Sequence, residues 1–278
     1  AQGGLRGRAT MYFDIEKLTK TFGTRTALDK VSIKAQHPEM IGVIGRSGAG
    51  KSTLLRCINR LTDADSGRII VDGTDVTCLA GRDRRLWRAR CAMIFQQFNL
   101  VPRLDVVTNI LCGTLSRRPV WAGLFNFFSR DDIDRAVELL HHLSLEDHGL
   151  DRAGNLSGGQ QQRVAIARAL MQNPDIILAD EPIASLDPRN AEQIMQILHD
   201  INRQENKLVL VNLHSVDMAR RFCDRIIGLR QGRVVFDGPV DALDDRAVAA
   251  IYDGARADAA MAASVTANLE ERHDPLSA

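Results

Sequence analysis

The run Gly45-Arg46-Ser47-Gly48-Ala49-Gly50-Lys51-Ser52-Thr53 constrains the fold of this chain more than any other stretch. Two glycines separated by four residues precede Lys and Ser, which is the phosphate-loop pattern. The apolar run 40–44 just before it favours a buried parallel strand. Apolar residues at helical spacing come just after it, at Leu54, Leu55, Ile58 and Leu61. A strand, a glycine loop and a helix in this order predict an α/β fold.

The loop predicts a site for a nucleoside triphosphate. Its glycines let several backbone N–H groups point at one phosphate, and the helix N-terminus adds positive potential there. Lys51 can reach the outer phosphates, and the hydroxyl of Ser52 can ligate the Mg²⁺ that accompanies them. The alternative is a chance glycine turn, and the flanking strand and helix argue against it. We therefore expect residues 45–53 to bind the nucleotide.

Composition limits the other classes of function. The 278 residues suffice for one large α/β domain, or for a core with a subdomain. Lys and Arg number 36 against 35 Asp and Glu, and this balance argues against a general nucleic-acid binder. No apolar run approaches the length of a membrane span, and the five scattered cysteines are typical of reduced thiols in a cytosolic protein. We expect no nucleic-acid partner.

The order of the expected strands and helices along the chain predicts one folded domain over residues 11–253. Residues 11–36 alternate as two strands around a turn at Gly23, which predicts N-terminal antiparallel strands. Residues 97–170 favour helices and indicate a helical subdomain inserted into a mainly parallel sheet. We expect flexible tails at 1–10 and 254–278.

Aromatic side chains gather in the stretch Trp121 to Phe128. It is either a packed loop of the helical subdomain or an apolar patch offered to a partner. Phe22, beside the turn at Gly23, poses a similar choice between core packing and stacking on a purine.

Polar residues stand where three predicted strands end. They are Gln96, the pair Asp180 and Glu181, and His214. Ligands bind at the carboxyl ends of strands in a doubly wound sheet, so these side chains share the edge of the phosphate loop. Asp180 suits the Mg²⁺, and Glu181 suits accepting a proton from an attacking water. Taken singly, Gln96 and His214 could be ordinary surface or structural residues.

A second potential anion site opens another predicted helix. Leu156-Ser157-Gly158-Gly159-Gln160 places a serine and two glycines at its N-terminus. As a bare pattern, this could be only a helix cap.

The order and spacing of these five elements resembles the ATP-binding subunits of ABC transporters over residues 11–252. The run from Leu156 to Leu170 is highly specific to that family. The resemblance implies a phosphate-loop NTPase core and Mg²⁺-dependent ATP hydrolysis. One departure is Arg46, where many relatives have proline.

The resemblance also implies a role for each motif. Phe22 is similar to the aromatic that stacks on adenine. Lys51, Glu181 and His214 would be catalytic, His214 as the switch histidine at the γ-phosphate. Ser52, Gln96 and Asp180 would organise Mg²⁺. Residues that would contact the ATP of an opposite subunit in a homodimer are Ser157, Gly158, Gly159, Gln160 and Asp187.

Within the family, the chain resembles phosphonate importer ATPases most. The run Pro182-Ile183-Ala184-Ser185 is the most telling, together with 94–101 and the aromatic insertion. This implies a homodimer beneath two membrane permease subunits, at the cytoplasmic face of the bacterial inner membrane. An extracytoplasmic binding protein would supply phosphonate, phosphite or phosphate ester. The alternatives are an importer ATPase for another cargo, such as amino acids, and a soluble ABC-type ATPase.

Overall fold

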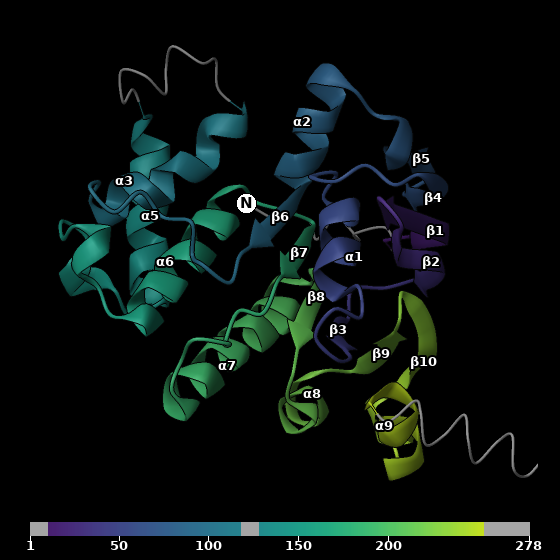
Figure 1. Ribbon diagram of the computed structural model, residues 1–278. Coiled ribbons are helices and arrows are strands. Elements are labelled where there is room, and N and C mark those ends of the chain that lie inside the picture. Colours follow the sequence, from purple (N-terminus) through teal and green to yellow (C-terminus); the bar gives the residue numbers. More distant parts are fainter. Residues whose placement is uncertain (1–10, 118–127, 253–278) are drawn as a thin grey trace, which may run out of the picture.

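The computed structural model describes residues 11–117 and 128–252 (Figure 1). The predicted tails at 1–10 and 254–278 lie outside the described residues, as does the aromatic stretch except for Phe128. Across the two described segments, no helix combines the length and apolarity needed to cross a membrane.

A six-stranded sheet forms the core, in the order β10-β9-β3-β8-β7-β6. Neighbours are parallel except at the terminal hairpin of β9 and β10. Every residue of β3, β6, β7 and β8 is buried, as expected for a parallel sheet covered on both faces. The strands are β3 (Met40–Ile44), β6 (Cys91–Ile94), β7 (Ile176–Ala179), β8 (Leu208–Leu213), β9 (Arg225–Arg230) and β10 (Arg233–Pro239).

A second, antiparallel sheet lies over one face of the core sheet, with the order β2-β1-β4-β5. Its strands are β1 (Phe13–Phe22), β2 (Arg25–Ala35), β4 (Ser66–Val71) and β5 (Thr74–Asp75). Helix α1 (Lys51–Ile58) lies between the two sheets and contacts β2 and β8, and α2 (Gly81–Arg90) joins the same apolar cluster through Trp87 (Figure 1). One apolar cluster joins Phe13 and Leu54 to Ile41, Leu178 and Leu210 of the core strands. The predicted N-terminal hairpin therefore packs on the core.

The other helices that the structure describes share one apolar cluster with the opposite face of the core sheet. Core-strand residues that alternate with those above, such as Met40, Ile177 and Val209, pack there with apolar helix residues. The helices are α3 (Val106–Leu111), α5 (Arg130–His142), α6 (Gly158–Met171), α7 (Pro188–Glu205), α8 (Val216–Phe222) and α9 (Asp245–Tyr252). Short 3₁₀ turns span Val76–Cys78, Cys112–Arg117, Glu146–His148, Ala153–Asn155 and Val240–Ala242.

Helices α3, α5 and α6 pack against one another and form a helical group beside the β6 edge (Figure 1). This group occupies the region where the sequence predicts an inserted subdomain, whose boundaries stay a prediction. Helix α6 also contacts β6 and α7, so it connects the group to the core.

Candidate nucleotide-binding site

The loop between β3 and α1 depends on glycine at two positions. Gly45 has φ +152° and Gly50 has φ +108°. A Cβ on Gly45 would lie 2.2 Å from the carbonyl oxygen of Leu229, and one on Gly50 would lie 2.4 Å from that of Ala27. Because no side chain fits against these backbone atoms, the loop can approach β9 and β2 only with glycine.

Lys51, the first residue of α1, lies inside this loop and is 4% exposed. Its Nζ donates to the carbonyl oxygen of Gly45 at 2.8 Å and to that of Arg46 at 3.4 Å. Burial lowers the pKa of Lys51, and the carboxylates of Glu181 and Asp180 act in the opposite direction. The ammonium is thus fixed at the loop by backbone oxygens.

Asp180, directly after β7, connects the loop to the carboxyl edge of the sheet. Its Oδ1 accepts a hydrogen bond from Ser52 Oγ at 2.7 Å and another from Asn212 Nδ2 at 2.7 Å. Arg56 Nη2 lies 3.9 Å from Oδ2. Asp180 is 5% exposed, so these donors compensate a buried carboxylate.

Glu181, the next residue, has a different environment. Its Oε1 lies 2.7 Å from Nε2 of His214, which follows β8. The backbone of Glu181 has φ +51°, a left-handed conformation that a residue with a side chain adopts at a cost. The two consecutive carboxylates have different partners: Asp180 binds Ser52, and Glu181 binds His214.

A cavity of about 450 Å³ lies over the loop. Phe22 stands at its border, is 51% exposed, and has Lys20 Nζ 5.3 Å from its ring centroid. Arg25 Nη2 donates to the carbonyl oxygen of Gly48 at 2.9 Å and so attaches the loop to β2. An exposed aromatic face beside a phosphate loop can stack on a base. The lining residues are Phe22, Arg25, Ala27, Ser47, Gly48, Gly50, Lys51, Ser52, Thr53 and Glu181.

The oxygen atoms at this site fit Mg²⁺ bound together with phosphates. Ser52 and Asp180 supply a hydroxyl and a carboxylate oxygen 2.7 Å apart, and hard oxygen ligands are those that Mg²⁺ prefers. Within the part of the chain that the structure describes, no three or more His, Cys, Asp or Glu residues cluster as a metal cage. Phosphate oxygens and water would therefore complete the coordination, as is usual for Mg²⁺.

The predicted second anion site lies at the N-terminus of α6. Ser157 caps this helix: its Oγ accepts from the Gln160 backbone N–H, and its own N–H donates to Gln160 Oε1. Gly159 packs so closely that a Cβ there would lie 2.8 Å from Asn190, whereas one on Gly158 would meet its nearest neighbour at 3.4 Å. Ser157 therefore caps α6, and anion binding at this helix N-terminus stays a prediction.

Two further predicted residues lie outside the cavity lining. Asp187 caps α7, with Oδ1 accepting from the Asn190 N–H at 3.0 Å, and this hydrogen bond lowers its pKa. Gln96 is exposed just after β6, the strand at the far side of β7. Its predicted contact with Mg²⁺ therefore stays a prediction.

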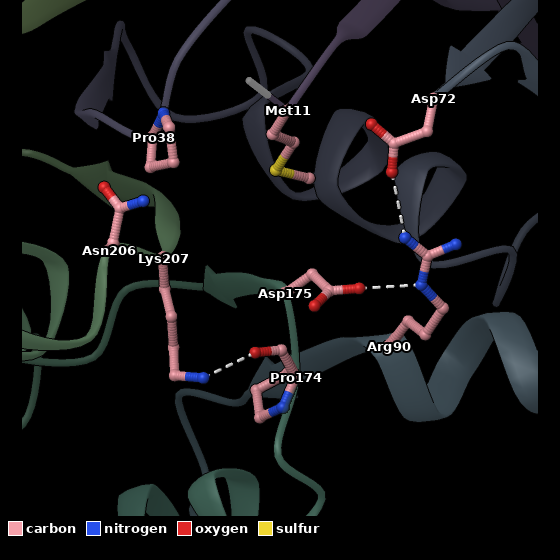
Figure 2. A pocket seen from close by; sticks show the side chains of 8 residues that line it. All are labelled: Met11, Pro38, Asp72, Arg90, Pro174, Asp175, Asn206 and Lys207. Atoms are coloured by element: carbon pink, nitrogen blue, oxygen red, sulfur yellow. Dashed lines mark hydrogen bonds and ion pairs between the residues drawn. The ribbon is translucent and has the colours of Figure 1, made fainter. Parts of the chain in front are cut away.

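Another pocket, of about 190 Å³, lies at the opposite edge of the core sheet, where β3, β6, β7 and β8 begin (Figure 2). Its charged side chains already have hydrogen-bond partners within the lining. Arg90 binds both Asp72 and Asp175, and Lys207 Nζ donates to the carbonyl oxygen of Pro174 at 2.7 Å. These contacts indicate that the pocket's side chains connect the strand ends.

Two site residues escape prediction from the sequence. Asn212 lies inside an otherwise apolar strand, and a polar residue in such a run is itself the available signal. Arg25 follows a turn on the N-terminal hairpin, where an arginine has no distinguishing pattern. Its contact with Gly48 depends on the packing of the two sheets.

The fold and the loop together define a phosphate-loop nucleotide-binding protein. The model of one family, described as ABC transporter, matches residues 28–184, which is more than half of the 278 residues. The chain belongs to the ABC transporter family.

Curated relatives cover almost the whole chain. It is 56% identical over 252 residues to the "Phosphonates import ATP-binding protein PhnC 2" of Roseobacter denitrificans, covering 91% of this chain and 93% of the relative. It is 52% identical over 270 residues to a protein called "Phosphonates import ATP-binding protein PhnC" from Rhizobium etli, covering 96% of each.

Solved structures agree with this assignment. A dimeric bacterial ABC transporter cassette superposes with a TM-score of 0.73 at 35% identity, covering 82% of this chain and 98% of that one. An ADP-bound ABC cassette gives a TM-score of 0.74 at 28% identity, covering 86% and 97%. The predicted ABC ATPase fold is thereby confirmed.

Proposed function

We propose that this chain is the ATP-hydrolysing subunit that powers phosphonate import through an ABC transporter. The observation that carries the proposal is the pair of carboxylates after β7, of which Asp180 bonds to Ser52 of the phosphate loop and Glu181 to His214. Cargo is supported by the phosphonate importers among the relatives, at 52–56% identity.

The described side chains divide the chemistry among themselves. Lys51 and the loop amides bind the phosphates and stabilise charge that develops on them. Glu181 accepts a proton from the attacking water, while His214 orients Glu181 and contacts the γ-phosphate. Ser52, Asp180 and Gln96 hold Mg²⁺, which neutralises phosphate charge when it is bound. Phe22 stacks on the adenine.

Two copies of the chain form the working unit in this proposal. Ser157, Gly158, Gly159, Gln160 and Asp187 contact the ATP held by the opposite subunit. The exposed cap residue Ser157 of α6 and the dimeric cassette structure with the same fold support this arrangement. The homodimer lies at the cytoplasmic face of the bacterial inner membrane, beneath two permease subunits, and an extracytoplasmic binding protein delivers the phosphonate.

Reconstitution tests the cargo and the partners. The chain would be purified from native membranes with its permease, placed in proteoliposomes, and supplied with ATP and the cognate binding protein. We expect 2-aminoethylphosphonate or phosphite to stimulate both ATP hydrolysis and uptake, and amino acids to stimulate neither. Stimulation by amino acids alone would overturn the cargo, and recovery of only soluble partners would overturn the transporter.

A further inference from the structure

The end of β8 contacts both carboxylates that follow β7. Asn212 Nδ2 donates to Asp180 Oδ1 at 2.7 Å, and His214 Nε2 lies 2.7 Å from Glu181 Oε1. The parallel register causes this pairing, because Ala179 of β7 lies opposite Val211 of β8. Residues 212–214 are therefore level with the carboxylates one strand away.

The contact with Asn212 restricts how the Asp180 carboxylate can turn. Oδ1 accepts two hydrogen bonds, one from Ser52 on α1 and one from Asn212 on β8. Both Asn212 and Asp180 are buried, at 0% and 5% exposure, so solvent does not replace these bonds. Two donors from different elements on one oxygen fix the carboxylate plane, and Oδ2 keeps a separate direction.

Asn212 is poorly suited to a purely structural role. A carboxylate only accepts hydrogen bonds, so the amide NH₂ faces Asp180 and Oδ1 faces away. That Oδ1 is buried and has no hydrogen-bond partner among the described residues. Leucine would fill a similar volume in this strand of buried apolar residues and would leave no polar atom unpaired. A buried polar group kept at this cost calls for another explanation.

We propose that Asn212 is a positioning residue that holds Asp180 in the orientation that binds Mg²⁺ with the nucleotide. The proposal rests on the proposed function, because it concerns the same Mg²⁺ and ATP. Partners that orient a metal ligand commonly change metal affinity tenfold or more when they are removed. The strand that supplies His214 would then also set the metal carboxylate.

The test is the Mg²⁺ dependence of nucleotide binding by the full chain. A fluorescent N-methylanthraniloyl ATP would be titrated in EDTA and over a series of Mg²⁺ concentrations. For Asn212→Leu we expect unchanged affinity in EDTA and a rise of about tenfold in the Mg²⁺ concentration at half-saturation. Asn212→Val should give the same shift. Val209→Ala, a change at another buried residue of β8, is the matched control and should leave the Mg²⁺ dependence unchanged.

The outcomes separate the two proposals. A half-saturation within about twofold of the parent in both Asn212 variants would overturn the positioning role. An equal shift in Val209→Ala would also overturn it, because general loosening of β8 would then suffice. The EDTA titration adds a second readout. A variant that loses affinity equally with and without Mg²⁺ would have a damaged phosphate loop, and this result would also overturn the positioning role. A parent chain that binds the analogue neither with nor without Mg²⁺ would overturn the proposed function itself.

Discussion

Nε2 of His214 lies 2.7 Å from Oε1 of Glu181, although 33 residues separate them in the chain. The contact crosses from the end of β8 to the end of β7, which are neighbours in the sheet. The histidine is 48% exposed and the glutamate 18%, so the pair lies at the border between the core and the cavity. The carboxylate of Glu181 is thereby held at a defined place beside the phosphate loop.

Changing Glu181→Gln should abolish turnover and spare binding. The amide keeps the shape of the side chain but cannot accept a proton, so hydrolysis should fall about a hundredfold or more. Phosphate release and binding of the fluorescent analogue would be measured on the same preparation. Lys51→Ala is the control with the reverse defect, because it should lose nucleotide affinity. Hydrolysis by Glu181→Gln above about half the parental rate would contradict the role.

The Glu181→Gly variant should have a higher folding stability than the Glu181→Ala variant. The φ of +51° is strained for any residue with a Cβ, and relief of this strain is worth about 1 kcal/mol. Thermal unfolding of Glu181→Gly and Glu181→Ala would be compared. At Ala247, inside α9, the same comparison should favour alanine by about 1 kcal/mol. If the alanine variant is the more stable one at both positions, the left-handed backbone at Glu181 carries no measurable strain, and the prediction is wrong.

Lys51→Met should change how stability depends on alkaline pH. Burial lowers the pKa of Lys51 below its ordinary value of 10.5. Near that pH the unfolded chain therefore binds more protons at this residue than the folded chain, and folding stability rises with pH. The free energy of unfolding of the parent, relative to Lys51→Met, should increase as pH is raised toward 10.5. Chemical denaturation at several pH values measures the free energy of unfolding of both proteins. A difference between them that stays constant or falls with pH would contradict the lowered pKa of Lys51.

Gly159→Ala and Gly158→Ala should differ in their effect on folding stability. A Cβ at 159 would lie 2.8 Å from Asn190, whose Nδ2 donates to Asp187 at 2.5 Å. Asn190 must then move, and stability should fall by about 1 kcal/mol. A Cβ on Gly158 would lie 3.4 Å from its nearest neighbour, which is an ordinary contact, so alanine there should leave the melting temperature unchanged or slightly raised. Equal melting temperatures would show that Asn190 moves freely.

Most of the candidate site can be predicted from local sequence patterns. The phosphate loop, the strand-end carboxylates and the histidine depend on patterns of neighbouring residues, and the structure places Lys51, Ser52, Asp180, Glu181 and His214 around one loop. Parallel strands bring their carboxyl ends together, so a shared edge for these residues could be expected from the sequence alone.

Contacts between segments that are distant in the chain do not follow from local sequence patterns. In the sequence Asn212 is one residue of an otherwise apolar strand, and its bond to Asp180 depends on β8 lying next to β7. Arg25 is connected to Gly48 only through the packing of the antiparallel sheet on the loop. Neither register nor sheet packing follows from a local pattern.

Arg46 of the phosphate loop binds the backbone at the end of α9. Its Nη1 donates to the carbonyl oxygen of Tyr252 at 3.4 Å, and Arg230 Nη1 donates to that of Ala250 at 2.9 Å. The Tyr252 hydroxyl in turn donates to the carbonyl oxygen of His214 at 3.4 Å. The last turn of α9 therefore lies against both the phosphate loop and the backbone of His214. A dye attached to this turn is therefore expected to report nucleotide occupancy.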